Sequence, residues 1–450
     1  MSPVEPLTAR RLAALLARDQ VDGRLPSVAA GVVRDGELAW VGSCGDATGL
    51  EATADAADVQ YRIGSITKTL VAGLVLELRD EGRLDLNDRL DAHLPGVAYG
   101  DRTLRSLLSH SSGMHSEPVG SWWERSPGGS FDDLVADLDE ADAPFPAGTT
   151  YHYTNIAFGL LGEMVARLRG APWFDVVQER ILTPLGMHRT SYLPSAPAAT
   201  GYSVDHFAGT LTEEPSQDTG AMAPAGQVWS TVADLARYAG FLVAGHPDVL
   251  AAPTLDEMAT LQSATRTGAA GGGYGLGLRL VHGDAGTLVG HTGSMPGYLA
   301  FCFADRSRRT AAVGLANGTA GLRCEGLPVE LLSTLEECEP TLPEPWRPTR
   351  AVPGRVSDVL GVWYWGNTAF GFSWNGHEVV ATGLASGLEN YRFVLGGDRL
   401  VGTSGYHHGE RLEAVRNDDG SVSHLVCATF VYTRTPYDPA APIPGGHPTR

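Results

Sequence analysis

Residues 59–82 read VQYRIGSITKTLVAGLVLELRDEG, and the predicted fold is built outward from this stretch. Val59–Ile63 is typical of a short strand-like segment that leads to Gly64 and the helix after it. From Ser65 to about Glu81, apolar residues recur at three- and four-residue spacing, which predicts a helix. Gly82 is expected to end that helix.

Ser65 and Lys68 form a Ser-x-x-Lys pattern at the predicted start of this helix. Residues three apart lie on one face of a helix, so the Lys68 amine can reach the Ser65 hydroxyl. A serine becomes nucleophilic beside a base, and a lysine can act as that base when burial lowers its pKa. The alternative is a helix start with a surface lysine, since the pattern is frequent by chance.

A second polar cluster, Tyr153-Thr154-Asn155, precedes an apolar helical run that begins at Ile156. Alternate spacing can aim the first and third side chains at one cleft. A phenol can relay protons between a nucleophile and a leaving group, and a carboxamide can orient a lysine and a substrate carbonyl. The alternative makes Tyr153 a core aromatic residue and Asn155 the N-cap of the helix.

The third cluster is His291-Thr292-Gly293-Ser294, which follows a predicted strand. Gly293 permits a close approach of the backbone to a ligand. An edge strand here could pair with a peptide-like substrate. The backbone amides of Ser294 and Ser65 could form an oxyanion hole. The alternative is an ordinary strand end with a polar turn.

Strand patterns lie at both ends of the first three quarters of the chain, and helical patterns lie between them. Arg34-Asp35-Gly36 separates two apolar runs and predicts a hairpin. Four later strands and a closing helix are predicted at Tyr274–Val281, Thr287–His291, Leu299–Ala304, Thr310–Leu315 and Leu322–Leu335. The fold class is therefore mixed α/β (α+β), with one sheet made from distant segments and an inserted helical lobe. A cleft between the lobes is the expected site.

A proline-rich stretch divides the chain. Residues 339–353 contain five prolines and predict a stiff linker. Beyond it the sequence predicts a small antiparallel barrel or sandwich, with strands at Leu360–Trp365, Phe370–Trp374, Glu378–Thr382, Tyr391–Leu395, Arg399–Thr403, Arg411–Arg416 and Val422–Thr433. The expected domains are thus 1–338 and 354–450.

The composition narrows the functional classes. A formal net charge of −19 over 450 residues argues against nucleic acid or an anionic membrane as a partner. The five cysteines contain no CxxC pair, so neither a disulfide framework nor a zinc knuckle is predicted. The N-terminal segment Leu7–Gln20 reads as an amphipathic helix rather than a secretory signal. We therefore expect a cytoplasmic protein without a membrane span.

The order Ser-x-x-Lys, Tyr-x-Asn and His-Thr-Gly resembles the class C β-lactamase and D-alanyl-D-alanine carboxypeptidase superfamily, a group of penicillin-recognising serine hydrolases. The stretches Leu107–Met114, Ala225–Thr231 and Tyr274–Leu278 resemble that family too. The resemblance runs from about Leu7 to Leu335. The C-terminal domain resembles lipocalin-like appendages found on some superfamily peptidases and on penicillin-binding-protein-type thioesterases.

The resemblance implies that Ser65 forms an acyl-enzyme and that Lys68 and Tyr153 share the proton transfers. It implies substrate-binding roles for Asn155, His291, Thr292, Gly293 and Ser294, and neither a metal nor a cofactor. Two departures from the family pattern matter. His291 stands where many relatives carry lysine, and a mostly neutral histidine weakens recognition of a substrate carboxylate. Typical β-lactamases and wall carboxypeptidases are exported, whereas this sequence shows no export signal.

Three functions remain open from the sequence. The first is hydrolysis of small peptides, amides or esters, including substrates with a D-residue beside the scissile bond. The second is a peptide-releasing or peptide-cyclising thioesterase, which would take a carrier protein as its partner. The third is a non-catalytic binding protein on the same fold.

His110 and His115 lack zinc-site spacing, and we expect solvent or loop roles for them.

Overall fold

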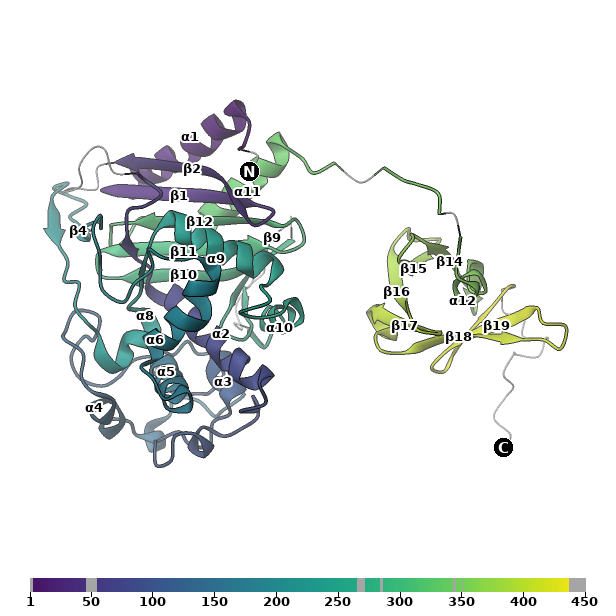
Figure 1. The fold of residues 1–450 in the computed structure, drawn as a ribbon, viewed down its shortest axis with the longest axis horizontal. Helices are drawn as coiled ribbons and strands as arrows, with labels where there is room; N and C mark the ends of the chain where they lie inside the picture. The colour runs from purple at the N-terminus through teal and green to yellow at the C-terminus, as the bar shows by residue number, and fades with distance from the viewer. Residues whose placement is uncertain are drawn as a thin grey trace. The chain divides into compact units, whose positions relative to one another are not determined.

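The computed structural model describes residues 3–45, 55–264, 272–283, 286–342, 345–349 and 351–436. The chain divides into two compact units, Met1–Leu342 and Pro343–Arg450 (Figure 1). Residues 343–344 and 350 of the predicted linker, and residues 437–450 of the predicted C-terminal domain, lie outside the described residues. Within those described ranges, no helix is both long and apolar enough to cross a membrane.

An eight-stranded antiparallel sheet forms the centre of the first unit, in the order β2-β1-β12-β11-β10-β9-β8-β7. Its strands are β1 (Ser27–Arg34), β2 (Glu37–Gly45), β7 (Ser263–Ala264), β8 (Gly273–Tyr274), β9 (Arg279–Gly283), β10 (Gly286–Met295), β11 (Tyr298–Asp305) and β12 (Thr310–Ala316). The predicted hairpin is β1–β2, and Asp35 and Gly36 in its turn have φ of 51° and 84°. The sheet joins the two ends of the unit, as the sequence predicts.

Both faces of the sheet are covered by helices. Alternate residues of a strand point to opposite faces. Val28, Ala30 and Val32 therefore pack in one core cluster with α1 (Pro6–Gly23) and α11 (Gly326–Cys338). Ala29 and Val33 belong to the other cluster, where α9 (Val232–Ala244) crosses the opposite face (Figure 1). Because both faces of the sheet are buried, β1 consists of an almost continuous run of apolar residues.

A helical lobe is inserted between β2 and β7. Helices α2 and α5 pack against each other and against α8, and α3 and α6 contact α5. The lobe comprises α2 (Thr67–Asp80), α3 (Leu104–Leu108), α4 (Phe131–Ala136), α5 (Ile156–Arg169), α6 (Trp173–Val177), α7 (Thr183–Leu185), α8 (Ala223–Gly226) and α10 (Ala252–Met258). Two short strand pairs lie between these helices. One joins β3 (Tyr61–Arg62) to β6 (Trp229–Ser230), and the other joins β4 (Tyr202–Val204) to β5 (Leu211–Glu213).

Two strand predictions in this unit need correction. The segment predicted as one strand, Tyr274–Val281, forms β8 and β9 with a turn between them, in which the Gly275 amide donates to the Leu278 carbonyl over 2.8 Å. Gly277 has a φ of 76°, and a Cβ there would lie 2.1 Å from the Ala72 side chain, so the turn packs directly on α2. In addition, β10 continues through Met295, so the His-Thr-Gly-Ser motif lies within a strand rather than after one.

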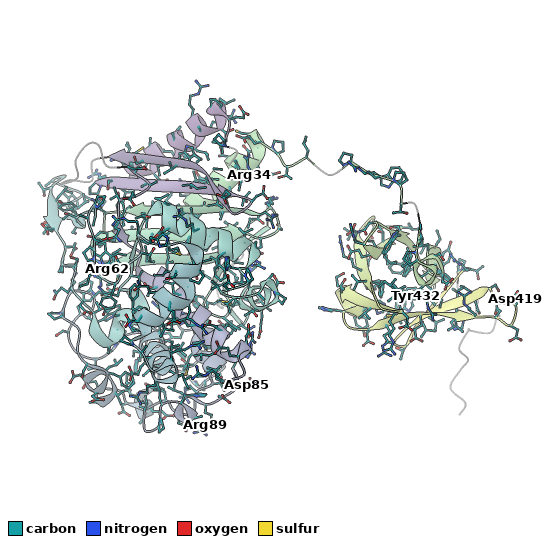
Figure 2. The ribbon with its side chains drawn as sticks, in the orientation of Figure 1. Arg34, Arg62, Asp85, Arg89, Asp419 and Tyr432 are labelled. Carbon is teal, nitrogen blue, oxygen red and sulfur yellow. The ribbon has the colours of Figure 1, made fainter. Side chains whose placement is uncertain are left out.

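The second unit is a closed eight-stranded antiparallel barrel, which resolves the predicted choice between barrel and sandwich. After α12 (Gly354–Ser357), its strands are β13 (Gly361–Trp365), β14 (Thr368–Trp374), β15 (Glu378–Gly383), β16 (Glu389–Gly396), β17 (Arg399–Ser404), β18 (Arg411–Arg416), β19 (Val422–Cys427) and β20 (Phe430–Thr433). The segment predicted as one long strand is β19 and β20, separated by a turn at Ala428 with a φ of 51°. Tyr432 is buried in the barrel core (Figure 2).

Candidate active site

Ser65 lies where β3 leads into the helical lobe. It belongs to a 3₁₀ turn, η1 (Gly64–Ile66), and α2 begins only at Thr67, so the helix predicted from Ser65 starts two residues later. Lys68 in the first turn of α2 is fully buried, whereas Ser65 is partly exposed. The two side chains still meet, because Lys68 Nζ lies 2.9 Å from Ser65 Oγ. Lys68 Nζ also donates to the carbonyl of Ala225 in α8 over 2.6 Å.

The environment of Lys68 favours its neutral amine. Burial lowers the pKa of Lys68 to about 7, while the carboxylates of Glu117 and Glu124 act in the opposite direction. A lysine with such a pKa is substantially unprotonated near neutral pH and can accept a proton. The surface-lysine alternative is therefore inconsistent with the structure.

Tyr153 lies against the same amine. Lys68 Nζ is 5.0 Å from the centroid of the Tyr153 ring. Burial raises the pKa of the Tyr153 phenol, and Ser65 opposes the rise. The buried Tyr153 hydroxyl has no hydrogen-bond partner among the described residues. The phenol is therefore protonated at neutral pH, and its chemistry here is that of a proton donor.

Asn155 is held by a residue that the sequence analysis did not single out. Its Nδ2 donates to Glu117 Oε1 over 2.6 Å, and Glu117 also accepts from Trp123 Nε1 over 2.7 Å. Although α5 begins one residue later, the Asn155 side chain makes no capping hydrogen bond. Glu117 lies in the loop that precedes α4, where no periodicity marks it, so only the folded chain reveals its position.

The imidazole of His291 faces the protein interior. Its Nδ1 donates to the Thr292 carbonyl, and Nε2 accepts from the Tyr274 hydroxyl over 2.8 Å. Burial, together with the charge of Lys68, lowers the pKa of His291 to about 3, so the ring is neutral. Both nitrogens have protein partners and the residue is buried. Farther along β10, Thr292 is partly exposed and Ser294 is exposed.

Two glycines bring β10 against the turn that carries Ser65. Gly64 has a φ of 52°, and a Cβ there would lie 2.5 Å from the Ser294 amide nitrogen. A Cβ on Gly293 would lie 1.9 Å from the Ile63 carbonyl oxygen. Only glycine permits so close a backbone contact. The backbones of Ser65 and Ser294 are thus neighbours, as an oxyanion hole built from their amides requires.

His110 is the largest departure from the sequence analysis. We expected a solvent or loop role, but its side chain is fully buried. Its ring centroid lies 4.2 Å from that of Tyr153 and 4.4 Å from that of Tyr274. The stretch Leu107–Met114 was noted for its family likeness, and that likeness was the only signal available for this position.

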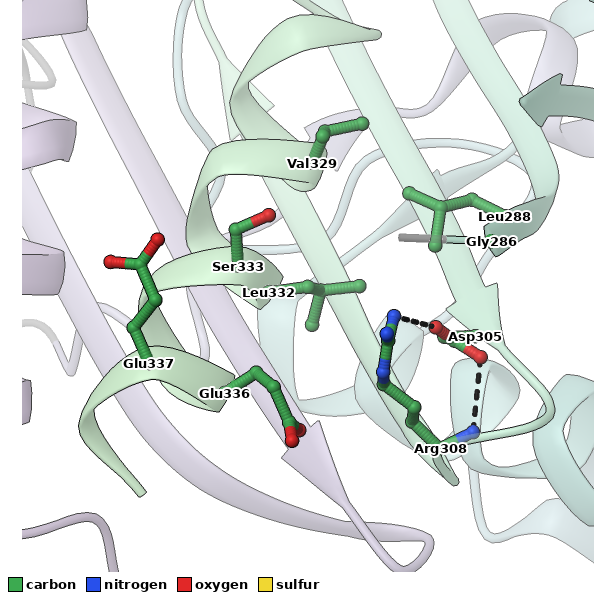
Figure 3. A pocket seen from close by; sticks show the side chains of 9 residues that line it. All are labelled: Gly286, Leu288, Asp305, Arg308, Val329, Leu332, Ser333, Glu336 and Glu337. Atoms are coloured by element: carbon green, nitrogen blue, oxygen red, sulfur yellow. Dashed lines mark hydrogen bonds and ion pairs between the residues drawn. The ribbon is translucent and has the colours of Figure 1, made fainter. Parts of the chain in front are cut away.

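A separate cavity of about 240 Å³ lies between α11 and the neighbouring ends of β10 and β11 (Figure 3). Its lining combines the apolar side chains of Leu288 and Leu332 with the carboxylates of Glu336 and Glu337. None of the predicted site residues lines it.

Among the residues that the structure describes, no group of three or more His, Cys, Asp or Glu side chains is arranged to hold a metal ion.

Comparison with protein families gives two matches. The beta-lactamase family model matches residues 10–332, and a domain of unknown function (DUF7586) matches residues 352–434. Penicillin-binding protein 4 of Amycolatopsis lactamdurans is 29% identical over 325 residues, which cover 66% of this chain and 79% of that protein. The D-alanyl-D-alanine-carboxypeptidase/endopeptidase AmpH of Escherichia coli (strain K12) is 30% identical over 195 residues, covering 40% and 48%.

Solved structures agree on the fold. The octameric penicillin-binding protein homologue from Pyrococcus abyssi has a TM-score of 0.66 at 22% identity, covering 94% of this chain and 99% of that one. A D-stereospecific amidohydrolase from Streptomyces sp. has a TM-score of 0.61 at 26% identity, covering 73% and 98%. The family model spans well over half of the sequence and includes the serine–lysine pair. This chain therefore belongs to the beta-lactamase family of serine hydrolases.

Proposed function

We propose that this protein hydrolyses small peptide, amide or ester substrates through an acyl-enzyme on Ser65, with a D-residue next to the scissile bond. The observation that carries the proposal is the pair Ser65–Lys68. Lys68 Nζ lies 2.9 Å from Ser65 Oγ, and the pKa of the buried amine is lowered to about 7. This contact gives the serine a base that is available near neutral pH.

In this mechanism the neutral amine of Lys68 takes the proton of Ser65 while Oγ attacks the carbonyl carbon. The backbone amides of Ser65 and Ser294 stabilise the oxyanion. Tyr153, which keeps its proton because burial raises its pKa, gives that proton to the leaving group as the acyl-enzyme forms and takes one back from the Lys68 ammonium. Water then attacks the acyl carbon and passes its proton to the neutral Lys68 amine. Lys68 returns this proton to Ser65 Oγ as the acid is released, so all three side chains regain their starting states. Asn155 and the segment of β10 from Thr292 to Ser294, in which Thr292 is partly exposed and Ser294 is exposed, position the substrate.

Two findings support the choice of substrate. The Streptomyces relative, at 26% identity, is a D-stereospecific amidohydrolase. The neutral, fully hydrogen-bonded His291 leaves β10 without a cation at the position where many relatives carry lysine. We therefore expect amides and esters without a free carboxylate to be better substrates than carboxylate-terminated peptides. We also place the activity in a reducing cytoplasm, since all five cysteines are unpaired.

The test is intact mass spectrometry after incubation with a fluorescent penicillin and, separately, with a fluorophosphonate. Wild type should gain one adduct that is absent from Ser65→Ala. The amides of D- and L-phenylalanine then test stereochemistry, with D-amide turnover expected to dominate. Turnover of a peptidyl thioester to a cyclic product instead of the acid would replace hydrolysis by the thioesterase function. Activity that persists in Ser65→Ala would contradict the mechanism.

A further inference from the structure

His110 is a buried titratable residue that the proposed mechanism does not use. It follows α3 with a φ of 54°, a left-handed conformation that is uncommon for a residue with a side chain. Such a backbone persists only where the surrounding structure enforces it. Its contacts explain why the chain keeps a histidine here.

The first set of contacts fixes the backbone around Tyr153. The Thr154 amide donates to His110 Nδ1 over 3.1 Å, and the His152 amide donates to the His110 carbonyl over 2.8 Å. These two bonds hold the residues on either side of Tyr153. They therefore fix the direction in which the Tyr153 side chain leaves the backbone.

The second set of contacts fixes the Tyr153 ring. The imidazole lies 4.2 Å from the Tyr153 ring at an interplanar angle of 36°. On another side it meets Tyr274 edge-on, with centroids 4.4 Å apart. The Tyr274 hydroxyl in turn donates to His291 of β10. One ring thus connects the Tyr-x-Asn segment to the His-Thr-Gly strand.

Besides these two sets of contacts, the imidazole of His110 has a third relevant property, which is that it carries no charge. Because Nδ1 accepts from Thr154, the single proton of the neutral imidazole is on Nε2. Burial, and next the positive charge of Lys68, hold the pKa of His110 well below its usual value. A charged ring would lose its acceptor and place a second cation near Lys68. Phenylalanine would supply the ring without the acceptor, and asparagine the acceptor without the ring.

We propose that His110 is a positioning residue for Tyr153, a neutral imidazole whose acceptor and ring together aim the phenol at the Ser65 reaction centre. The proposal rests on the proposed function, because it assigns to Tyr153 the protonation of the leaving group. It makes a specific kinetic prediction. A misplaced phenol should slow reactions whose leaving group needs a proton and leave those with a good leaving group nearly unchanged.

The test compares kcat/KM for D-phenylalanine p-nitroanilide and D-phenylalanine p-nitrophenyl ester. The anilide leaves as an amine and needs a proton, whereas the nitrophenolate does not. In His110→Phe and His110→Asn, the anilide value should fall about 10- to 100-fold, and the ester value should fall less than about threefold. Tyr153→Phe should show the same split. Asparagine tolerates a positive φ, so His110→Asn should fold even if His110→Phe does not.

The matched control is His407→Phe, which removes a fully buried histidine from the barrel, where Nε2 pairs with the Tyr432 hydroxyl. It should leave both rates unchanged. Circular dichroism and thermal melting establish that each variant is folded. A folded His110 variant that keeps its anilide rate, or loses both rates equally, would overturn the proposal. Wild type that cleaves neither substrate would instead refute the proposed function itself.

Discussion

The amine of Lys68 must lose its own proton before it can take one from Ser65, so the rate of acylation depends on pH. With a pKa of about 7, the neutral fraction grows as pH rises through neutrality. The Glu117 carboxylate raises this pKa. Glu117→Gln should therefore move the midpoint of the acid limb to lower pH, because removing a negative charge disfavours the ammonium form.

The measurement is the rate of fluorophosphonate labelling of Ser65 from pH 5 to pH 9. The carboxamide introduced by Glu117→Gln can still accept from Asn155 through its oxygen, whereas its NH2 group cannot accept from Trp123 Nε1. Glu163→Gln, which alters an ion pair on the surface of α5, is the control and should leave the midpoint unchanged. A midpoint that moves to higher pH in Glu117→Gln would show that Lys68 is not the titrating base.

The glycine before the nucleophile gives a second prediction at this scale. Gly64→Ala adds a Cβ at a φ of 52° and 2.5 Å from the Ser294 amide nitrogen. We expect a loss of about 1–3 kcal/mol in the free energy of unfolding and a large drop in Ser65 labelling, because η1 and β10 must separate.

Gly82→Ala separates the effect of the positive φ from the effect of the steric contact with Ser294. Gly82 has a similar φ of 71°, but nothing lies within 4 Å of the added Cβ. It should lower the free energy of unfolding by about 1–2 kcal/mol and leave labelling unchanged. Urea unfolding and labelling rates check both variants. Equal labelling of the two would mean that the contact between Gly64 and Ser294 does not shape the site.

Among the secondary-structure elements, α9 combines a local cap at its N-terminus with hydrogen bonds to a distant segment of the chain. Thr231 is the N-cap residue of α9, and its side chain accepts from the Asp234 amide over 3.2 Å. The Asp234 carboxylate does not complete a capping box. It accepts instead from the Arg189 amide and the Thr190 hydroxyl, and thereby ties α9 to the segment after α7.

Thr231→Val keeps the shape of the side chain and removes the acceptor. The free energy of unfolding should fall by about 1 kcal/mol, with a range of roughly 0.5–2, because the buried Asp234 amide loses its partner. Thr231→Ser keeps the acceptor and is the control. Urea denaturation of both variants is the measurement. A serine variant less stable than the valine variant would show that packing outweighs the cap.

At the scale of the whole molecule, every residue of the candidate site lies in the first unit, and so do two of the three core clusters. A chain that ends at Leu342 should therefore fold and be labelled at Ser65 at a rate within about threefold of the full chain. The barrel unit has its own core cluster around Trp363 and Phe393.

Labelling of the shortened chain by the fluorophosphonate, with Ser65→Ala in the same chain as the control, checks this expectation. A shortened chain that melts cooperatively but is not labelled would assign the barrel a part in forming the site. In that case the labelling of the full chain, compared with that of the two units mixed together, would show whether covalent connection is needed.

The fold class, the strand-rich C-terminal unit and the pairing of Ser65 with Lys68 could all be predicted from the sequence. These follow from short-range physics: apolar periodicity, turn residues, and the geometry that places side chains three apart on one side of a turn. That geometry brings Lys68 to Ser65 even though the turn at Ser65 is 3₁₀ rather than α. Separate strands such as β8 and β9 were harder to predict, because Gly277 bends the chain only against α2.

The charge and orientation of each functional side chain depend on the folded chain around it. The pKa of Lys68 falls because the lobe buries it, and His291 turns inward because Tyr274, 17 residues away, donates to it. Glu117 and His110 carry no local pattern, since their partners Asn155 and Thr154 lie 38 and 44 residues away in the chain. Spacing along the chain can propose which residues react. Their charge and orientation depend on burial and on contacts between distant segments, which exist only after the chain has folded.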